Sequence, residues 1–501
     1  MSPERCLTSL ASDVRHQEGD IRDGIGGVHF HGVMSIASRK TNNEEGGVLS
    51  MREKLNVMVV GAVPGPGGRE HAIARACARS ARTQTVFFVS PNADVIKEEK
   101  VVPVMDINPG NFSGLISFVR LHGVAFTIVG SEDLLLAGIV DAFEKEGLQI
   151  IGPSRKAAWI TEGNKAACKK LVLAAPVGEI GIPTAGYASF SEAWRARSYI
   201  AGYGVPCVIK PAFVTGGKGV RVITTNLADA YEAVDELMAT RPGKIILVEK
   251  FLKGRELSFI VMVDETGGFA CLIPTQDYKE LNGRMTGGMG ARTVPEMNSA
   301  LHDKIIDQIV RPTIAKLLSL GVPYKGFLYF GLMIARENGE EQPYVLELNC
   351  RLGDPEAQVI LSVMESDFVE LCVAFFENRL DRVVIEWEES QYVAVVVVGP
   401  GYPARPIIGD VVYNLEKVKE LPDVDVFYSG VAFNAAGEPI SAGGRVVAVG
   451  ARGNTLDEAY VRAHGAASLV SIGDPDPQMG TQVIRPDVGL VTNSRPTDTA
   501  I

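Results

Sequence analysis

Along the first third of the chain, short apolar runs alternate with stretches whose apolar residues recur at helical spacing. A short apolar run fits a buried strand, and the amphipathic stretches fit helices that cover a sheet. Strands that alternate with helices form a parallel sheet with helices on both faces. The pattern therefore predicts a doubly wound parallel sheet, with strands at residues 55–60, 86–89, 125–129 and 148–151 and helices beginning near Arg69, Asn111 and Asp133.

Ligands bind such a sheet at the carboxyl ends of its strands, because the loops there lead into helix N-termini with unpaired N–H groups. Three loops are expected at that edge, at Gly61–His71, Ser90–Asp94 and Gly130–Asp133. The first is rich in glycine. A tight strand-to-helix turn needs glycine even without a ligand, so this loop alone is a weak signal.

After Gly152 the pattern changes to a helix expected at residues 164–174 and then to a hairpin. The first strand of the hairpin ends in Lys210, and the tip reads Gly-Gly-Lys-Gly at residues 216–219. Backbone N–H groups and Lys218 at such a tip can close over a triphosphate, while Lys210 reaches the phosphates from the strand. The spacing is not that of a Walker A loop, and a purely structural glycine turn is the alternative interpretation.

An apolar strand at residues 245–248 runs into Glu249-Lys-Phe-Leu, and Glu256 follows after a turn. A linker of this kind can hold an adenine by backbone hydrogen bonds, and a carboxylate can accept two ribose hydroxyls. A further glycine-rich stretch, Thr286–Ala291, is expected to form a loop over substrate.

The strand predicted at residues 344–351 carries the most informative chemistry. Side chains alternate along a strand, so Glu347, Asn349 and Arg351 share one face. A carboxylate and an amide oxygen two residues apart suit Mg²⁺, and a guanidinium beside them suits an anion or a transferring phosphoryl group. A solvated, half-exposed strand explains the motif equally well when it is taken alone. The residues expected on the opposite, core-facing side are Leu346, Leu348 and Cys350.

From Trp387 onward the chain becomes strand-rich, with a final helix expected at residues 455–468. Few potentially catalytic side chains are clustered there, so this module is expected to act mainly as scaffold. The predicted organisation is an extension (1–53), an N-terminal α/β substrate domain (54–155), a nucleotide-binding domain (156–385) with a small lid subdomain (181–248), a C-terminal α/β domain (386–490) and a tail (491–501).

Composition narrows the class of protein. A chain of 501 residues with 46% hydrophobic and 22% charged residues is typical of a multidomain globular enzyme. The net charge of -11 argues against a nucleic-acid binder, and no apolar run is long enough to span a membrane. The seven cysteines lack metal-binding spacing, which favours a reducing, cytoplasmic setting. Residues 1–53 lack periodicity and are expected to be disordered.

Taken together and in order, the motifs resemble the phosphoribosylamine–glycine ligase family of ATP-grasp enzymes. The resemblance runs from about Leu55 to Asp487 and is far more specific than any one motif. The segments that carry it are residues 67–72, 152–154, 162–166, 208–219, 254–259, 286–291, 326–329 and 347–356.

The resemblance implies roles for individual residues. The metal, Mg²⁺ or Mn²⁺, would be bound by Glu347 and Asn349. Catalytic roles would fall to Lys218, Arg351 and Asp354. ATP would contact Lys165, Lys210, Gly216, Gly217, Gly219, Glu249, Phe251, Leu252 and Glu256. The other substrates would contact Gly68, Arg69, Glu70, Asn92, Gly288 and Gly290.

The implied activity is ATP-dependent ligation of glycine to 5-phosphoribosylamine through a glycyl phosphate, in cytoplasmic purine synthesis. The implied partners are these small molecules and other enzymes of purine synthesis. The chain departs from the family pattern in the substrate loops, where Ala62–Pro66 is additional, Asp94 replaces a glycine and the segment from Lys279 to Thr286 is short. Two alternatives therefore stay open: another ATP-grasp carboxylate–amine ligase, or a non-catalytic nucleotide-binding homologue.

Overall fold

A computed structural model describes residues 54–61, 67–90, 94, 96–174, 181–215 and 219–490, all of which belong to one unit that spans residues 51–501. The expected extension at 1–53 and tail at 491–501 lie outside the described residues. So do four of the expected site residues, Asn92, Gly216, Gly217 and Lys218.

The N-terminal part is a five-stranded parallel sheet with strand order β3-β2-β1-β4-β5, which confirms the predicted doubly wound α/β class. The edge strand β3 was not predicted. Its sequence, Val-Val-Pro-Val, is short and contains a proline, which sheets tolerate at an edge. The strands are β1 (Leu55–Val60), β2 (Thr83–Val89), β3 (Val101–Val104), β4 (Val124–Val129) and β5 (Ile150–Ile151).

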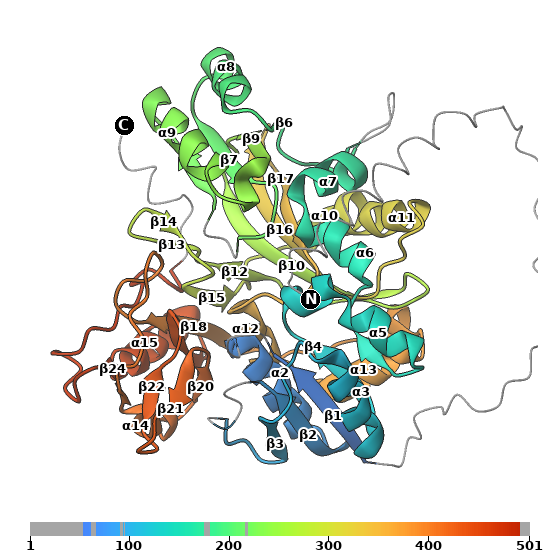
Figure 1. The fold of residues 1–501 in the computed structure, drawn as a ribbon, viewed down its shortest axis with the longest axis vertical. Helices are drawn as coiled ribbons and strands as arrows, with labels where there is room; N and C mark the ends of the chain where they lie inside the picture. Colours follow the sequence, from blue (N-terminus) through green and yellow to red (C-terminus); the bar gives the residue numbers. More distant parts are fainter. Residues whose placement is uncertain are drawn as a thin grey trace, which may run out of the picture. The chain divides into compact units, whose positions relative to one another are not determined.

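Four helices accompany this sheet (Figure 1). The single helix expected from Asp133 is divided in two at Gly138, whose φ of 92° lies in the left-handed region that ends helices. The helices are α2 (Gly68–Arg79), α3 (Phe112–Leu121), α4 (Glu132–Ala137) and α5 (Ile139–Lys145).

The segment after Gly152 is helical but irregular. Two of its turns are wound as wider π-helix, so the helix expected at 164–174 is regular only at its start. Such π-turns are frequent at functional sites. The pieces are α6 (Arg155–Ala158), η2 (Trp159–Gly163), α7 (Lys165–Ala167) and η3 (Cys168–Leu173).

A four-stranded antiparallel sheet follows, with strand order β6-β9-β7-β8 (Figure 1). The predicted hairpin is present, because β7 and β8 pair antiparallel on either side of the glycine-rich tip. Helices α8 and α9 pack against this sheet around a core that includes Ile200, Ile209 and Val234. The bounds are β6 (Tyr187–Phe190), α8 (Ala193–Tyr203), β7 (Cys207–Pro211), β8 (Arg221–Ile223), α9 (Leu227–Met238), η4 (Pro242–Lys244) and β9 (Ile246–Lys250).

The largest sheet has nine strands, with the order β17-β16-β10-β12-β15-β18-β23-β20 and β11 paired to β10. It continues from residues 156–385 into the C-terminal module, across residue 385. Its strands are β10 (Arg255–Val263), β11 (Phe269–Cys271), β12 (Thr275–Asp277), β15 (Gly290–Thr293), β16 (Gly326–Glu337), β17 (Glu340–Asn349), β18 (Gln391–Val398), β20 (Val424–Tyr428) and β23 (Arg445–Gly453).

The remaining elements are short strands and covering helices. The small strands are β13 (Glu280–Leu281), β14 (Arg284–Met285), β19 (Val412–Tyr413), β21 (Val431–Phe433), β22 (Pro439–Ser441) and β24 (Ser471–Ile472). The helices are α10 (Ser299–Ile305), η5 (Ile306–Val310), α11 (Arg311–Ser319), α12 (Glu356–Ser362), α13 (Phe368–Phe376), η6 (Leu380–Arg382), α14 (Leu415–Lys419) and α15 (Leu456–Ala467).

Strand β17 contains a bulge that corrects one expectation. Gly331 on β16 pairs with Glu347, but the next residue, Leu332, pairs with Val345, so Leu346 has no partner position. Val345 is buried in the core and Leu346 is only half-buried. The prediction that Leu346 faces the core was therefore wrong, because an extra residue in one strand reverses the alternation. Beyond the bulge, Leu348 and Cys350 are core residues as predicted.

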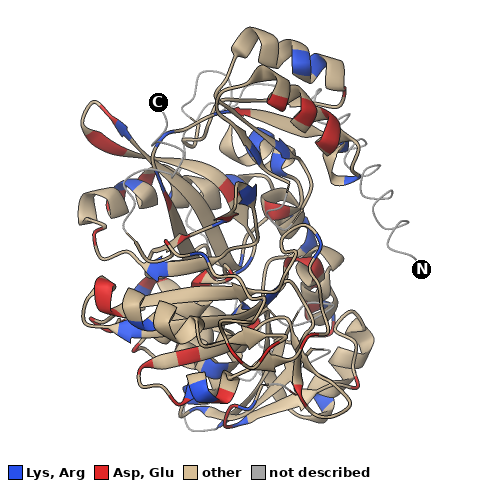
Figure 2. Cartoon of the chain, turned by 90° about the vertical axis from the view of Figure 1, so that its left-hand side faces the viewer, with Lys and Arg blue, Asp and Glu red and all other residues tan. Residues whose placement is uncertain are grey.

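Charged residues of both signs are interspersed over the elements drawn in Figure 2. Among the helices in the described part of the chain, none combines the length and the apolar character that a membrane crossing requires. The six cysteines in this part are free thiols, and five of them are buried.

Helix α2 is joined to the C-terminal module by His71. This ring is 1% exposed, its Nδ1 accepts the Tyr428 backbone N–H at 2.9 Å, and its Nε2 lies 3.0 Å from Glu98 Oε1. Burial lowers the pKa of His71 from 6.5 to about 4, although Glu98 opposes this shift. The histidine is therefore a neutral structural link between α2 and the C-terminal module.

This link predicts a pH-dependent stability. Between pH 6.5 and about 4, the unfolded chain binds a proton at His71 that the folded chain does not. The free energy of unfolding should therefore fall by about 2 kcal/mol from pH 7 to pH 5 through this group. Urea unfolding at pH 5, 6 and 7 checks this, because His71→Gln should flatten the slope. Equal slopes in the variant and the parent would contradict it.

Candidate active site

One cavity of about 510 Å³ is lined by six of the sixteen candidate residues that the structure describes: Arg69, Lys165, Glu347, Asn349, Arg351 and Asp354. Its walls come from the start of α2, the loop before α4, the π-turn η2, the strands β12, β16 and β17, and the C-terminal module. The lining side chains used below are Arg69, Glu132, Glu162, Lys165, Asp277, Lys279, Tyr329, Glu347, Asn349, Arg351, Asp354, Glu356, Tyr402, Ser429 and Arg445.

Glu347 and Asn349 both line this cavity, from one face at the end of β17. Lys279 Nζ lies 3.2 Å from Glu347 Oε1. Burial alone would raise the pKa of Glu347, but Lys279, Lys165 and Lys210 outweigh it and lower the pKa to about 2. The carboxylate is thus ionised at neutral pH, as a metal ligand must be.

The oxygen donors fit a hard divalent cation that takes only part of its shell from protein. Mg²⁺ commonly takes one or two carboxylates and fills its shell with water and substrate phosphate. In the described ranges no group of three or more His, Cys, Asp and Glu side chains is arranged to hold a metal. A site at Glu347 and Asn349 would therefore depend on the substrate for its remaining ligands.

Three lysines gather next to this face. Lys210 Nζ lies 2.9 Å from Glu249 Oε1 and donates to the Leu346 carbonyl at 3.0 Å. Lys169 Nζ lies 3.2 Å from the same Glu249 oxygen, and burial lowers the pKa of Lys169 to about 8. Burial and Lys210 also lower the pKa of Lys165. Two carboxylates, Glu249 and Glu347, face three lysines, so the cluster carries a surplus of positive charge suited to phosphates.

The expected nucleoside contacts lie elsewhere. Glu249 is buried at the end of β9 and uses its carboxylate on the two lysines, while Phe251 and Leu252 lie in the linker to β10. Glu256 is half-buried on β10. None of these four lines the 510 Å³ cavity, and Gly219 lies against Pro211 at the base of the hairpin tip.

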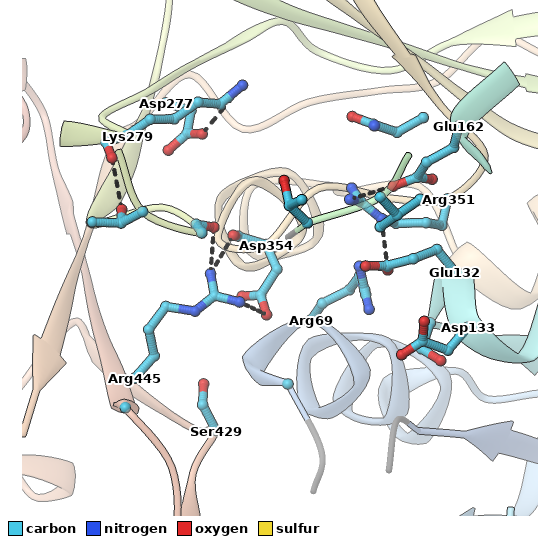
Figure 3. Close-up of a pocket in the computed structure, with 18 of the residues that line it drawn as sticks. Arg69, Glu132, Asp133, Glu162, Asp277, Lys279, Arg351, Asp354, Ser429 and Arg445 are labelled. Atoms are coloured by element: carbon cyan, nitrogen blue, oxygen red, sulfur yellow. Dashed lines mark hydrogen bonds and ion pairs between the residues drawn. The ribbon is translucent and has the colours of Figure 1, made fainter. Parts of the chain in front are cut away.

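Arg351 is held between two acids that were not predicted (Figure 3). Its Nε donates to Glu132 Oε2 at 3.2 Å and its NH2 donates to Glu162 Oε1 at 2.8 Å. Glu162 also accepts the Cys350 backbone N–H at 2.8 Å, which anchors the end of β17. Burial alone would raise the pKa of Glu132. Arg351 and Arg69 outweigh burial and lower this pKa to about 2.

Arg69 and Glu70 were both expected to contact substrate, but their surroundings differ. The Glu70 carboxylate is fully buried, accepts the Gly67 N–H at 2.8 Å and takes Arg69 NH2 at 2.7 Å. Arg69 lines the cavity, whereas Glu70 does not. Gly68 is packed against Gln358 and Ser429. Glu70 therefore positions Arg69 and caps α2, and of these two side chains it is Arg69 that lines the cavity.

Asp354 is bound by an arginine from the C-terminal module (Figure 3). Arg445 NH2 donates to Asp354 Oδ2 at 3.1 Å, and Arg445 NH1 donates to the carbonyls of Asp354 at 2.6 Å and Gly287 at 2.7 Å. The C-terminal module was expected to be mainly scaffold, and that expectation was incomplete. Gly443-Gly-Arg before a strand was the signal in the sequence.

The two glycines expected at the substrate differ in place. Gly288 has a φ of 116°, and an added Cβ would lie 2.7 Å from Pro355 Cδ and 2.8 Å from the Asp354 carbonyl oxygen. The loop at Gly288 therefore packs directly on the Asp354 turn. Gly290 is part of β15 beside Val488 and the Ala394 carbonyl, and neither of the two glycines lines the cavity.

Comparison with known proteins supports one family throughout. Three models match in order: the N domain of phosphoribosylglycinamide synthetase over residues 55–161, its ATP-grasp (A) domain over 164–357 and its C domain over 392–490. A phosphoribosylamine--glycine ligase of Vibrio parahaemolyticus is 37% identical over 426 residues, covering 83% of this chain and 95% of that protein. One of Yersinia pestis is 37% identical over 422 residues, covering 82% and 95%.

The chain belongs to the phosphoribosylamine–glycine ligase family.

Solved structures agree with this family. The phosphoribosylamine--glycine ligase of Thermotoga maritima has a TM-score of 0.68 and 27% identity, covering 86% of this chain and 100% of that one. A biotin carboxylase domain of Hydrogenobacter thermophilus, with a TM-score of 0.61 and 16% identity, shares the fold. As a member of the ligase family with an ATP-grasp domain, the chain is an ATP-dependent ligase.

The motifs in the sequence led to Glu347, Asn349 and the arginines but not to their partners. Glu132 and Glu162 belong to segments named in the sequence analysis. Their contacts with Arg351 could not be predicted, because they lie 219 and 189 residues before it in the sequence. Lys279 was noted only as the start of a shortened segment, and Asp277 precedes it by two residues. All four line the cavity of this phosphoribosylamine–glycine ligase family member.

Proposed function

We propose that this chain ligates glycine to 5-phosphoribosylamine with ATP, giving glycinamide ribonucleotide, ADP and phosphate, in cytoplasmic purine synthesis. The observation that carries the proposal is the cavity in which Glu347 and Asn349 face lysines on one side and arginines on the other. It is supported by relatives whose names state this ligation. The proposed domains are residues 54–155, 156–385 with a lid at 181–248, and 386–490.

In this proposal Glu347 and Asn349 would hold Mg²⁺ or Mn²⁺, which would neutralise charge on the phosphates. Lys165 and Lys210, with Lys218 and Gly216, Gly217 and Gly219 of the hairpin tip, hold the ATP phosphates. The linker at 249–252 holds the adenine and Glu256 the ribose. Arg351 and Asp354 border the reacting carboxylate, and Arg69 holds the phosphoribosyl group.

The chemistry needs no protein nucleophile. A glycine carboxylate oxygen attacks the γ-phosphorus of ATP, and the bond to the ADP oxygen breaks. The amine of phosphoribosylamine then attacks the carbonyl carbon, loses a proton and displaces phosphate. The protein contributes position and charge neutralisation, as in phosphoryl transfer generally.

Purified full-length chain incubated with ATP and Mg²⁺ tests the proposal directly. ADP release should require both glycine and phosphoribosylamine made in situ. Release with a different carboxylate in place of glycine would support another ATP-grasp ligase, to which the shortened segment between Lys279 and Thr286 points. The absence of any carboxylate-dependent release would indicate a non-catalytic nucleotide binder.

Lys210→Ala should raise the ATP KM by about 10- to 100-fold, because it removes a buried charge-assisted contact to phosphate. The KM for glycine should change little. Steady-state kinetics measure both values. Lys170→Ala is the matched control, since Lys170 is an exposed lysine in the π-turn η3. An unchanged ATP KM in Lys210→Ala would remove this lysine from the phosphate site.

A further inference from the structure

Asp277, which lines the cavity, has a buried carboxylate oxygen without a hydrogen-bond donor among the described residues. Asp277, at the end of β12, is 8% exposed and lines the cavity. Within the described part of the chain its Oδ1 accepts no hydrogen bond, and its Oδ2 lies 3.8 Å from Lys279 Nζ. A buried carboxylate oxygen without a donor is costly, so such atoms generally await a group that a ligand brings.

The surroundings of Asp277 favour a cation. Glu356 is 2% exposed, lines the same cavity and accepts the Ser258 hydroxyl at 3.0 Å. Tyr329 Oη lies 2.9 Å from the same Ser258 oxygen. Lys279 is the nearest cation, but it is shared with Glu347 at the shorter distance of 3.2 Å. This end of the cavity therefore has more carboxylate than positive charge.

The space beside Asp277 is narrow. An added Cβ on Gly288 would lie 3.3 Å from Asp277 Oδ1, in addition to its contacts with Pro355 and the Asp354 carbonyl. Backbone thus approaches the free oxygen closely. A compact ammonium group fits such a place better than a guanidinium or a branched amine.

Lys279 lies between Asp277 and the proposed metal ligand Glu347. Its Nζ lies between Asp277 and Glu347, at 3.8 Å and 3.2 Å, so the free carboxylate and the metal-facing carboxylate flank one lysine. Glycine has only one carbon between its ammonium and its carboxylate. An ammonium bound at Asp277 would therefore keep its carboxylate close to Lys279, which lies 3.8 Å from Asp277 Oδ2 and 3.2 Å from Glu347 Oε1.

We propose that Asp277 binds the ammonium group of the amino-acid substrate and so directs its carboxylate toward Lys279 and Glu347. This inference rests on the proposed function. Phosphoribosylamine also carries an amine, but the residue proposed for its phosphoribosyl group, Arg69, is bound through Glu70 and Glu132 and has no contact with Asp277 among those described. The amino-acid ammonium is therefore the occupant to which the geometry points.

The test compares Asp277→Asn with the unaltered chain in steady-state kinetics. The exchange keeps the shape of the side chain and removes its charge. The glycine KM should rise about 10- to 100-fold, while the KM values for ATP and phosphoribosylamine stay within about twofold. Glu280→Gln is the matched control, because Glu280 is three positions further along and does not line the cavity.

Each result decides the matter. An unchanged glycine KM in an active Asp277→Asn enzyme would overturn the inference and leave the proposed function intact. A rise confined to the phosphoribosylamine KM would overturn it too, and would assign Asp277 to the other amine. A parent enzyme that never uses glycine would instead refute the proposed function.

A second measurement needs no variant. Glycolate has a hydroxyl where glycine has its ammonium. In the presence of Mg²⁺ and a non-hydrolysable ATP analogue, glycine should raise the melting temperature of the unaltered chain at concentrations at least about 10-fold lower than glycolate. Equal effects of glycine and glycolate would show that no carboxylate recognises the ammonium, and would overturn the inference.

Discussion

Replacing Glu347 with glutamine should lower turnover by about 10³-fold or more while the chain still folds. The expected loss follows from the position of this carboxylate. Three surrounding lysines lower its pKa, so it is charged at neutral pH, and it shares a face with Asn349. Glutamine keeps the size of the side chain but removes the charge that holds a divalent cation. A metal ion at a transferring phosphoryl group supplies several kcal/mol, and each 1.4 kcal/mol is about a tenfold change in rate.

Turnover at saturating ATP and glycine measures this effect, and circular dichroism with urea unfolding checks the fold. Glu340→Gln is the matched control, because Glu340 lies on the same strand with a side chain that is 82% exposed. The control should retain full activity. Turnover within about tenfold of the parent in Glu347→Gln would remove this residue from the metal site.

Replacing Arg351 with methionine should cost about 3–5 kcal/mol of stability in addition to activity, because it leaves a buried acid without its partner. Arg351 is 17% exposed and pairs with Glu132 at 3.2 Å and Glu162 at 2.8 Å. Arg351→Lys should retain little of this stability, since one ammonium cannot donate to both acids in the two directions that the guanidinium reaches. Glu162→Gln added to Arg351→Met should recover part of the loss.

Urea unfolding of the single and double variants gives these free energies. Arg382→Met is the matched control, because the Arg382 side chain is 82% exposed, and it should change stability by less than about 0.5 kcal/mol. The Glu132 pKa is lowered by Arg351, so this pair stabilises the fold above about pH 4.5 and loses that contribution as the pH falls toward 2. An Arg351→Met chain as stable as the parent would contradict the described network.

Local patterns predicted the elements well and their junctions poorly. Val124–Val129 and Gln391–Val398 are strands because their apolar runs permit little else. The bulge at Leu346 was invisible because it depends on the partner strand, where Gly331 pairs with Glu347 and Leu332 with Val345. Register is a property of two strands, and one strand's sequence does not contain it.

The same limit applies to the site. Glu347, Asn349 and Arg351 were found because they lie within five residues of each other, although β17 ends at Asn349, two residues before the predicted end of the strand. Arg445 was missed because its partners, Gly287 and Asp354, are 158 and 91 residues away. The roles of Glu70 and His71 also needed the structure, since both side chains are occupied by contacts within the fold.

The central claim is that ATP activates the carboxylate of an amino acid at the Glu347 and Asn349 face. Glycine labelled with ¹⁸O in its carboxylate tests it most directly, in a full turnover with ATP, Mg²⁺ and phosphoribosylamine, followed by mass spectrometry of the released phosphate. Attack by the carboxylate on the γ-phosphorus predicts that one labelled oxygen is transferred to phosphate in each turnover. Phosphate without label, formed alongside the ligated product, would contradict it.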